Sequence, residues 1–302
     1  MLAETIQAIQ HSLSRLEQQE TLGREAHFVA RLQALDVLTF QILEHIENVQ
    51  YVHGYHAELA RLSLQAERLW QGLTEVNTQL FTRLQAALTT TPTPGPLLRQ
   101  FCDTYVGSAP PALAWEDLDA DALDVFVNGV LGIAHPPEET KPLEAGMIGY
   151  HPTPTRVIFA LLEHLQLQAH DVFYDLGAGL GRVALLVGLL TAAQARGVEF
   201  EPAYCAYATA RAHALNLPQV TFWNGDARHA EYANGTVFFL YTPFTGHLLQ
   251  AVLARLQTAA RTRAITIATY GACTHTVAQQ PWVQCTGQQA FRHDTLALFR
   301  SQ

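Results

Sequence analysis

The sequence predicts an α/β fold with a doubly wound, mostly parallel sheet, preceded by an all-α helical domain. Apolar residues recur at helical spacing through residues 1–88, which indicates amphipathic helices. From residue 146 onward, short apolar runs alternate with helix-forming segments. Alternation of this kind is typical of parallel sheets that helices cover on both faces.

Composition supports a folded chain that does not enter a membrane. Of the 302 residues, 49% are hydrophobic and 15% are charged, which excludes disordered and fibrous proteins. No apolar run reaches the ~20 residues that span a bilayer. The amino terminus also lacks the basic and apolar segments of a signal peptide. We therefore expect a cytoplasmic protein with no membrane partner.

The charge distribution and the cysteines limit which ligands and binding partners we expect. Residues 1–145 carry 19 acidic and 8 basic residues, whereas residues 146–302 carry 8 and 10. Proteins that bind a phosphate backbone usually present a basic stripe, so the sequence disfavours nucleic acid. The four cysteines are scattered without a CxxC motif, and we expect neither a disulfide framework nor a metal site.

The amino-terminal helices contain one regular heptad stripe. Its apolar residues alternate spacings of three and four, and Gly23 and Gly54 separate the helices. The members of this stripe are Leu59, Leu62, Ala66, Leu69, Leu73, Val76 and Leu80. Residues 1–88 are predicted to form a helical bundle, with a coiled-coil homodimer as the alternative.

Proline-rich sequence separates this region from the α/β domain. The run Thr89–Pro96 is expected to end helical structure. Residues 89–145 would form a linker and a helical connector whose best helix is 119–133. The α/β domain then spans 146–302. Its expected strands lie at 171–176, up to 199, 220–223, 237–241, 264–270, 282–284 and 295–300, and its helices at 157–167, 182–190, 202–215 and 247–257.

A glycine-rich turn follows the first expected strand. It runs from Gly177 to Gly181, where bare backbone lets a ligand approach closely. Arg182 stands where the dinucleotide motif G-x-G-x-x-G needs its third glycine, which disfavours a nicotinamide dinucleotide. The sequence also contains no G-x-x-x-x-G-K-[ST] motif.

Three acids occupy successive strand ends: Asp175, Glu199 and Asp226. The carboxyl ends of parallel strands meet at one ligand crevice. A carboxylate at the second strand can accept both hydroxyls of a ribose, and Asp226 could accept from an adenine amino group. Three acids without a phosphate-binding feature favour a cationic nucleoside cofactor.

At these residues the chain resembles the class I S-adenosylmethionine-dependent methyltransferases. Within them it is most similar to the non-SET nucleosomal lysine methyltransferases of the disruptor-of-telomeric-silencing type. The shared motifs are the Tyr-x-x-Thr loop at 150–153, FYDLGAGLG at 173–181, Gly-Val-Glu at 197–199 and Gly-Asp at 225–226. The resemblance covers about half of the chain, 146–302, and implies a Rossmann-like, seven-stranded sheet.

The resemblance also implies how S-adenosyl-L-methionine is held. Tyr150 and Thr153 would contact its methionine part, and Asp175 would bind the amino group, directly or through water. Gly177 and Gly179 would pass along it.

The same resemblance assigns the nucleoside part to other residues. Glu199 would hold the ribose, and Asp226 with the backbone of Ala227 would hold the adenine. Phe200 or Trp223 would flank the ring.

The segments expected to bind the methyl acceptor differ in sequence from those of that family. Its Asn-Asn-Phe segment is replaced by Tyr241-Thr242-Pro243-Phe244, and the entry loop carries His151. Tyr241 and His151 are the candidate catalytic residues, on an aromatic acceptor wall with Tyr150, Phe244 and Tyr270. Such a wall suits a small molecule held by packing, or one side chain of a protein partner.

We therefore expect transfer of the cofactor's methyl group by in-line displacement to a small-molecule acceptor. A protein lysine is the alternative acceptor. A noncatalytic S-adenosylmethionine-binding scaffold is the alternative from another class. The sequence identifies neither the acceptor, nor the atom that is methylated, nor a catalytic base.

Overall fold

The computed structural model describes residues 2–107, 121–286 and 295–302. The chain forms two compact units. The first comprises residues up to 87 together with 99–110, and the second comprises 88–98 together with 111–302. None of the described helices has the length and apolarity that crossing a membrane requires.

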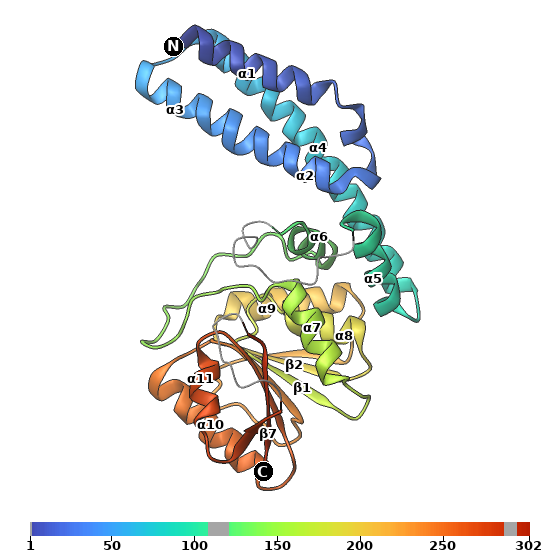
Figure 1. Ribbon diagram of the computed structural model, residues 1–302, viewed down its shortest axis with the longest axis vertical. Helices are drawn as coiled ribbons and strands as arrows, with labels where there is room; N and C mark the ends of the chain where they lie inside the picture. The colour runs from blue at the N-terminus through green and yellow to red at the C-terminus, as the bar shows by residue number, and fades with distance from the viewer. Residues whose placement is uncertain (1, 108–120, 287–294) are drawn as a thin grey trace. The chain divides into compact units, whose positions relative to one another are not determined.

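The first unit is a bundle of long helices (Figure 1). Its helices are α1 (Leu2–Glu17), α2 (Phe28–Asp36), α3 (Glu44–His53) and α4 (Ala57–Thr90), with a π-helical stretch at Val37–Leu43 between α2 and α3. Short 3-10 turns at Glu20–Gly23 and Glu25–His27 connect α1 to α2. Gly54 ends α3 with a φ of 80°, a conformation that favours glycine.

The heptad stripe of α4 is buried inside this bundle. Leu59, Leu62 and Ala66 are each at most 1% exposed and pack with Leu13 of α1 and Leu38 of the π-helical stretch. Burial of these apolar side chains is the main free-energy gain available to the bundle. The chain therefore covers this stripe with its own helices.

The predicted break at 89–96 is wrong in its extent. Helix α4 continues to Thr90, and α5 (Pro94–Tyr105) begins four residues later. Proline is tolerated in the first turn of a helix because an N–H there has no intrahelical partner. Pro94 and Pro96 therefore start a helix. The helix expected at 119–133 is α6 (Ala122–Leu131), and its first expected residues lie outside the described part.

The second unit contains a seven-stranded sheet among the described residues, in the order β3-β2-β1-β4-β5-β7-β6. The strands are β1 (Val172–Leu176), β2 (Gln194–Glu199), β3 (Val220–Asn224), β4 (Val237–Tyr241), β5 (Thr266–Tyr270), β6 (Val283–Cys285) and β7 (Ala297–Ser301). Strands β1 to β5 pair in parallel, and β7 lies antiparallel to both β5 and β6. The predicted mostly parallel sheet is confirmed.

Helices cover both faces of this sheet (Figure 1). On one face lie α7 (Thr155–Leu165), α8 (Arg182–Leu190) and α9 (Pro202–Ala214), and on the other lie α10 (Gly246–Ala260) and α11 (Cys273–Ala278). Buried apolar side chains, among them Phe238, Leu249 and Phe299, form the core between the sheet and α10. This packing fixes the carboxyl ends of the strands, where the sequence places its three acids.

Leu62→Ala tests whether the heptad stripe stabilises the bundle. The substitution is expected to lower the free energy of unfolding by about 2–5 kcal/mol, because it leaves a cavity in a packed core. Leu64→Ala is the matched control, since Leu64 lies on the same helix and is 49% exposed. Urea denaturation followed by circular dichroism measures both. Equal, small losses in the two variants would contradict a buried stripe.

Candidate cofactor and acceptor site

A cavity lies at the carboxyl ends of β1, β2 and β4. Its empty space is about 1120 Å³, a figure that includes the part open to solvent. All of the site residues predicted from the sequence line it: Tyr150, His151, Thr153, Asp175, Gly177, Gly179, Glu199, Phe200, Asp226, Ala227 and Tyr241. The fold thus brings these residues together, and their individual roles stay predictions.

Two further residues considered from the sequence lie outside the cavity lining. Trp223 is 44% exposed and lines a separate groove with Arg196 and Thr221. Tyr270 is buried behind Tyr241, with their ring centroids 4.9 Å apart. Phe200 is therefore the better placed aromatic residue for flanking a nucleobase.

The glycine turn is fastened to the end of β2. The N–H groups of Gly177 and Ala178 donate to the carbonyl oxygen of Val198 at 2.9 and 3.0 Å. Gly179 donates its N–H to Oε2 of Glu199 at 2.6 Å. These bonds hold the bare backbone of the turn against the cavity.

Close packing makes glycine necessary at two positions of this turn. Gly177 has a φ of 87°, and a Cβ there would lie 2.4 Å from Cβ of Pro243. Gly179 has a φ of 53°, and a Cβ there would lie 2.5 Å from the Tyr150 ring. Any side chain at Gly179 would therefore displace the aromatic residue expected to contact the cofactor.

Glu199 is a buried acid with backbone partners. Besides Gly179, it accepts the N–H of Glu201 on Oε1 at 2.8 Å. Burial raises the pKa of Glu199, and these N–H donors partly offset that effect. A carboxylate offers about four lone-pair positions, so both oxygens keep acceptor capacity for ligand hydroxyls.

Asp175, at the end of β1, is buried without such partners. It is 4% exposed, and its Oδ2 accepts no hydrogen bond from the described residues. Burial, and then the nearby Glu199 carboxylate, raise the pKa of Asp175 from 3.8 to about 8. A buried acid with an open oxygen is stabilised when a cationic group reaches it. Asp175 therefore fits the amino group of S-adenosylmethionine.

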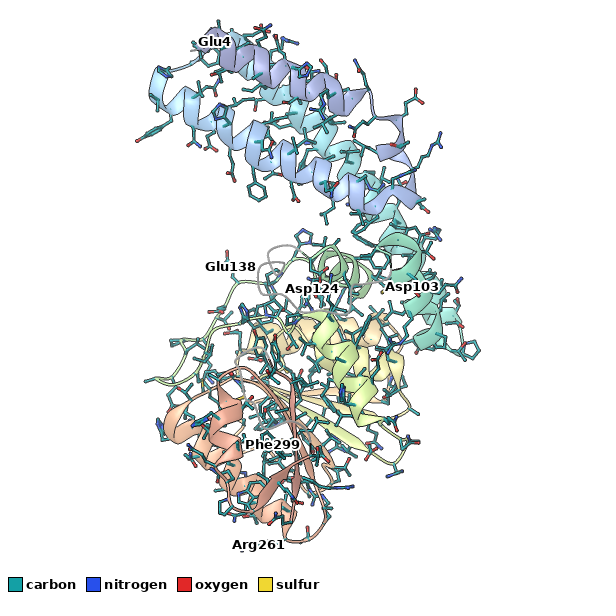
Figure 2. The ribbon with its side chains drawn as sticks, in the orientation of Figure 1. Glu4, Asp103, Asp124, Glu138, Arg261 and Phe299 are labelled. Carbon is teal, nitrogen blue, oxygen red and sulfur yellow. The ribbon has the colours of Figure 1, made fainter. Side chains whose placement is uncertain are left out.

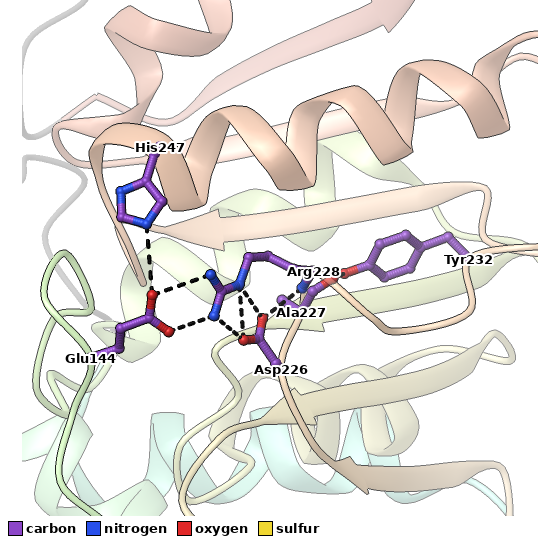
Figure 3. Close-up of polar contacts among 6 residues, drawn as sticks. All are labelled: Glu144, Asp226, Ala227, Arg228, Tyr232 and His247. Carbon is purple, nitrogen blue, oxygen red and sulfur yellow. Dashed lines mark hydrogen bonds and ion pairs between the residues drawn. The ribbon is translucent and has the colours of Figure 1, made fainter.

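Asp226, which follows β3, is engaged by a nearby arginine. The Nε of Arg228 lies 3.0 and 2.9 Å from the two carboxylate oxygens, and its backbone N–H donates at 2.8 Å. The side-chain hydrogen bond with Arg228 lowers the pKa of Asp226. Arg228 also reaches Glu144 (Figure 3). Arg228 is not among the residues predicted from the sequence, although the Asp-x-Arg spacing of Asp226 and Arg228 indicates a local pair.

Arg182, noted in the sequence only as a missing glycine, positions the Tyr-x-x-Thr loop. Its Nη1 donates to Asp124 at 2.8 Å and to the carbonyl oxygen of Thr153 at 2.9 Å, and its Nη2 donates to Asn128 at 2.6 Å. Asp124, on α6 (Figure 2), also accepts the N–H and the hydroxyl of Thr155 at the start of α7. This buried network fixes Thr153 at the cavity.

Aromatic rings form the edge of the cavity beyond β4. The rings of His151 and Tyr241 lie 5.6 Å apart, and burial raises the pKa of Tyr241, which keeps its hydroxyl protonated. Thr242 follows with a φ of 40°, an uncommon conformation for a residue with a side chain. Its Oγ1 accepts the N–H of Cys273 at 3.2 Å and donates to the carbonyl oxygen of Tyr270 at 3.3 Å.

Comparison with known families identifies this unit. Residues 149–275 match the family model described as "Histone methylation protein DOT1". The chain carries a class I S-adenosylmethionine-dependent methyltransferase domain, and within that class it is similar to the DOT1 type. The match extends from the Tyr150 loop through β5, and the resemblance noted in the sequence is confirmed.

Among the described residues there is no cluster of three His, Cys, Asp or Glu side chains that could hold a metal ion.

Solved structures similar to this methyltransferase include three bacterial proteins. An RNA methyltransferase from Salinibacter ruber, in complex with S-adenosyl-L-homocysteine, is 21% identical with a TM-score of 0.39, and the alignment covers 50% of this chain and 92% of that one. Precorrin-6y C5,15-methyltransferase from Geobacter metallireducens is 18% identical with a TM-score of 0.39, covering 52% and 92%. A SAM-dependent methyltransferase from Geobacter sulfurreducens, in complex with S-adenosyl-L-homocysteine, is 23% identical with a TM-score of 0.31, covering 38% and 48%. No curated protein sequence matches this chain.

Gly179→Ala is expected to damage both stability and binding. The left-handed backbone alone costs about 1–2 kcal/mol for an alanine, and the added methyl group displaces the Tyr150 ring. Gly72→Ala is the control, because Gly72 lies within α4 and a methyl group added there would meet nothing within 4 Å. That change should stabilise the chain by up to about 1 kcal/mol. Thermal unfolding and calorimetric titration with S-adenosyl-L-homocysteine measure both effects, and normal binding by Gly179→Ala would contradict the account.

Binding of S-adenosyl-L-homocysteine is expected to release a proton from Asp175. A pKa of about 8 keeps this carboxyl protonated at neutral pH, whereas a bound ammonium group favours its charged form. Affinity should therefore rise from about pH 6 towards pH 8 and then level off. Calorimetry in two buffers of different ionisation enthalpy counts the proton. Asp175→Asn should abolish the release, and a flat pH profile in the unchanged chain would contradict the assignment.

Proposed function

We propose that the chain transfers the methyl group of S-adenosylmethionine to the side-chain amino group of a protein lysine. The observation that carries this proposal is the DOT1 family match over residues 149–275. A small-molecule acceptor is the first expectation from the sequence. The family match supports the lysine alternative better, and the acceptor is revised accordingly.

Two buried acids support the proposed cofactor arrangement. Bound S-adenosylmethionine supplies a methyl group activated by a sulfonium centre. In the proposal, Asp175 holds the amino group and Glu199 accepts the ribose hydroxyls. Charges in a site of low dielectric act strongly, so these carboxylates favour a cationic ligand over a neutral one. Tyr150, Thr153, Gly177 and Gly179 would contact the methionine part.

The adenine is proposed to bind beside β3. Asp226 would accept from its amino group, the backbone of Ala227 would contact its ring edge, and Phe200 would lie against its face. Asp226 stays ionised for this purpose because Arg228 lowers the pKa of its carboxyl.

The lysine side chain is proposed to enter beside the paired rings of His151 and Tyr241. Aromatic rings pack against the methylene groups of a lysine and attract its ammonium form. In-line displacement needs the amine unprotonated and held close to the methyl carbon. His151 is exposed at the cavity and is proposed to take up the proton, since an imidazole nitrogen can act as a general base.

A small-molecule acceptor is the second candidate, and one specific feature favours it. The segment Thr242-Pro243-Phe244 offers no carboxamide or carboxylate to hold an amine.

The net charge of the chain bears on which lysine is the acceptor in the main proposal. This charge is −9, which would slow the encounter with DNA-coated nucleosomes. We therefore favour a lysine on a protein that is not wrapped in nucleic acid.

Transfer of labelled methyl groups tests the acceptor. The chain would be given labelled S-adenosylmethionine with nucleosomes, free DNA, lysate protein or a metabolite extract, each in a separate reaction. The proposal predicts label on lysine in the protein fraction, located by mass spectrometry. Label in the metabolite fraction alone would establish the second candidate. Cofactor binding without transfer to any fraction would instead favour a noncatalytic scaffold.

His151→Ala tests the proposed proton acceptor once an acceptor is found. We expect kcat to fall about 100-fold, in the range typical of general base catalysis, with affinity for S-adenosyl-L-homocysteine nearly unchanged. His170→Ala is the control, because His170 is exposed and lies outside the cavity lining. Unchanged kcat in His151→Ala would remove His151 from the mechanism.

A further inference from the structure

Two exposed apolar side chains lie on the loop of residues 139–150, at the edge of the cavity. Leu143 is 42% exposed and Ile148 is 48% exposed, and both line the cavity. Among the described residues of the second unit, the one other large apolar side chain in the exposed class is Trp223, which lines the separate groove. Exposed apolar surface in this unit is therefore concentrated at the cavity.

The two side chains belong to one surface. A Cβ added at Gly149, the residue after Ile148, would lie 3.9 Å from Cδ1 of Leu143, so Leu143 lies against the backbone next to Ile148. Gly149 is itself exposed. We call Leu143, Ile148 and Gly149 the apolar patch. Exposed apolar side chains that adjoin one another, unlike those scattered singly, indicate a surface that contacts another molecule.

The charged side chains of the same loop each engage another part of the chain. The three pairs are Glu139 with the Tyr204 hydroxyl, Lys141 with the Phe200 ring, and Glu144 with the Arg228 guanidinium (Figure 3). The charges of the loop are thus compensated within the chain. A partner at the apolar patch would meet a neutral surface, which suits an apolar side chain better than a charged one.

The apolar patch adjoins the proposed entry of the acceptor lysine. The N–H of Ile148 donates to the carbonyl oxygen of Pro243 at 3.0 Å. Pro243 lies two residues after Tyr241, and Ile148 lies three residues before His151. The same cavity is lined by all four residues. A lysine that reaches into this cavity leaves the residues beside it at the cavity edge, where the patch lies.

We propose that the apolar patch docks an apolar side chain that is close to the acceptor lysine in the sequence of the acceptor protein. The inference rests on the proposed lysine methylation and names the class of lysine that is methylated. Neighbouring residues of an extended segment are about 3.3 Å apart along the chain, so a side chain next to the lysine stays near the cavity edge. Its burial against Leu143 and Ile148 favours binding through the hydrophobic effect.

Mapping the methylated lysines in lysate protein is the first test. The unchanged chain would be given labelled S-adenosylmethionine, and mass spectrometry would identify each labelled lysine with its neighbouring residues. Leucine, isoleucine, valine, methionine and phenylalanine should be enriched beside labelled lysines, relative to all lysines of the sample. Neighbours that match the sample average would overturn the inference and leave the proposed function standing. Absence of label from every lysine would overturn both.

Ile148→Ser and Leu143→Ser test the apolar patch directly, on a mapped acceptor protein produced on its own. Each substitution should raise KM about fivefold, as expected for partial loss of one apolar contact, with kcat and the affinity for S-adenosyl-L-homocysteine unchanged. Replacing the apolar neighbour of the acceptor lysine by serine should raise KM of the unchanged chain by a similar factor. The two changes together should cost little more than either one, because they remove the same contact.

Leu64→Ser is the matched control, because Leu64 is exposed like Ile148 but lies on α4, outside the cavity lining. It should leave KM unchanged, and circular dichroism checks that each variant folds. Weaker binding of S-adenosyl-L-homocysteine by Ile148→Ser or Leu143→Ser would show that the patch contacts the cofactor. Fully additive losses would show that it contacts another part of the acceptor. Either result overturns the inference, as does an unchanged KM in both variants.

Discussion

Two carboxylates buried side by side constrain this site more than any other feature. Asp175 is the last residue but one of β1, Glu199 ends β2, and these strands are neighbours in the sheet. Backbone N–H donors compensate Glu199, whereas Oδ2 of Asp175 has no partner among the described residues. Burial, and then repulsion from the Glu199 carboxylate, raise the pKa of Asp175, so the cavity favours a cation. The glycine turn and the aromatic residues at the edge of the cavity lie around these two carboxylates.

Two arginines at the cavity hold loops. Arg182 is tied to Asp124 and to the carbonyl oxygen of Thr153, while Arg228 is tied to Asp226 and Glu144. Arg182, the first residue of α8, therefore joins that helix to the loop that carries Thr153, and Arg228 joins the segment after β3 to the loop that carries Glu144. Because both guanidiniums are paired with carboxylates, neither neutralises Asp175. A cationic group of the ligand can therefore serve as the partner of the Asp175 carboxylate.

The sequence predicts the fold and the strand-end acids well because both depend on local patterns. The apolar run at 237–241 predicts a strand that matches β4 at both ends. Pairings between distant segments leave no such pattern: Arg182 bonds Asp124, 58 residues away, and Arg228 bonds Glu144, 84 residues away. The predicted break at 89–96 is too long, because proline not only ends helices but here also starts α5.

A crystal structure of the chain with S-adenosyl-L-homocysteine would show whether Asp175 binds the ligand's amino group. We expect the amino nitrogen to lie about 3 Å from Oδ2 of Asp175, at hydrogen-bonding distance. An amino group bound elsewhere in the cavity, with Oδ2 of Asp175 still lacking a hydrogen-bond donor, would contradict this expectation.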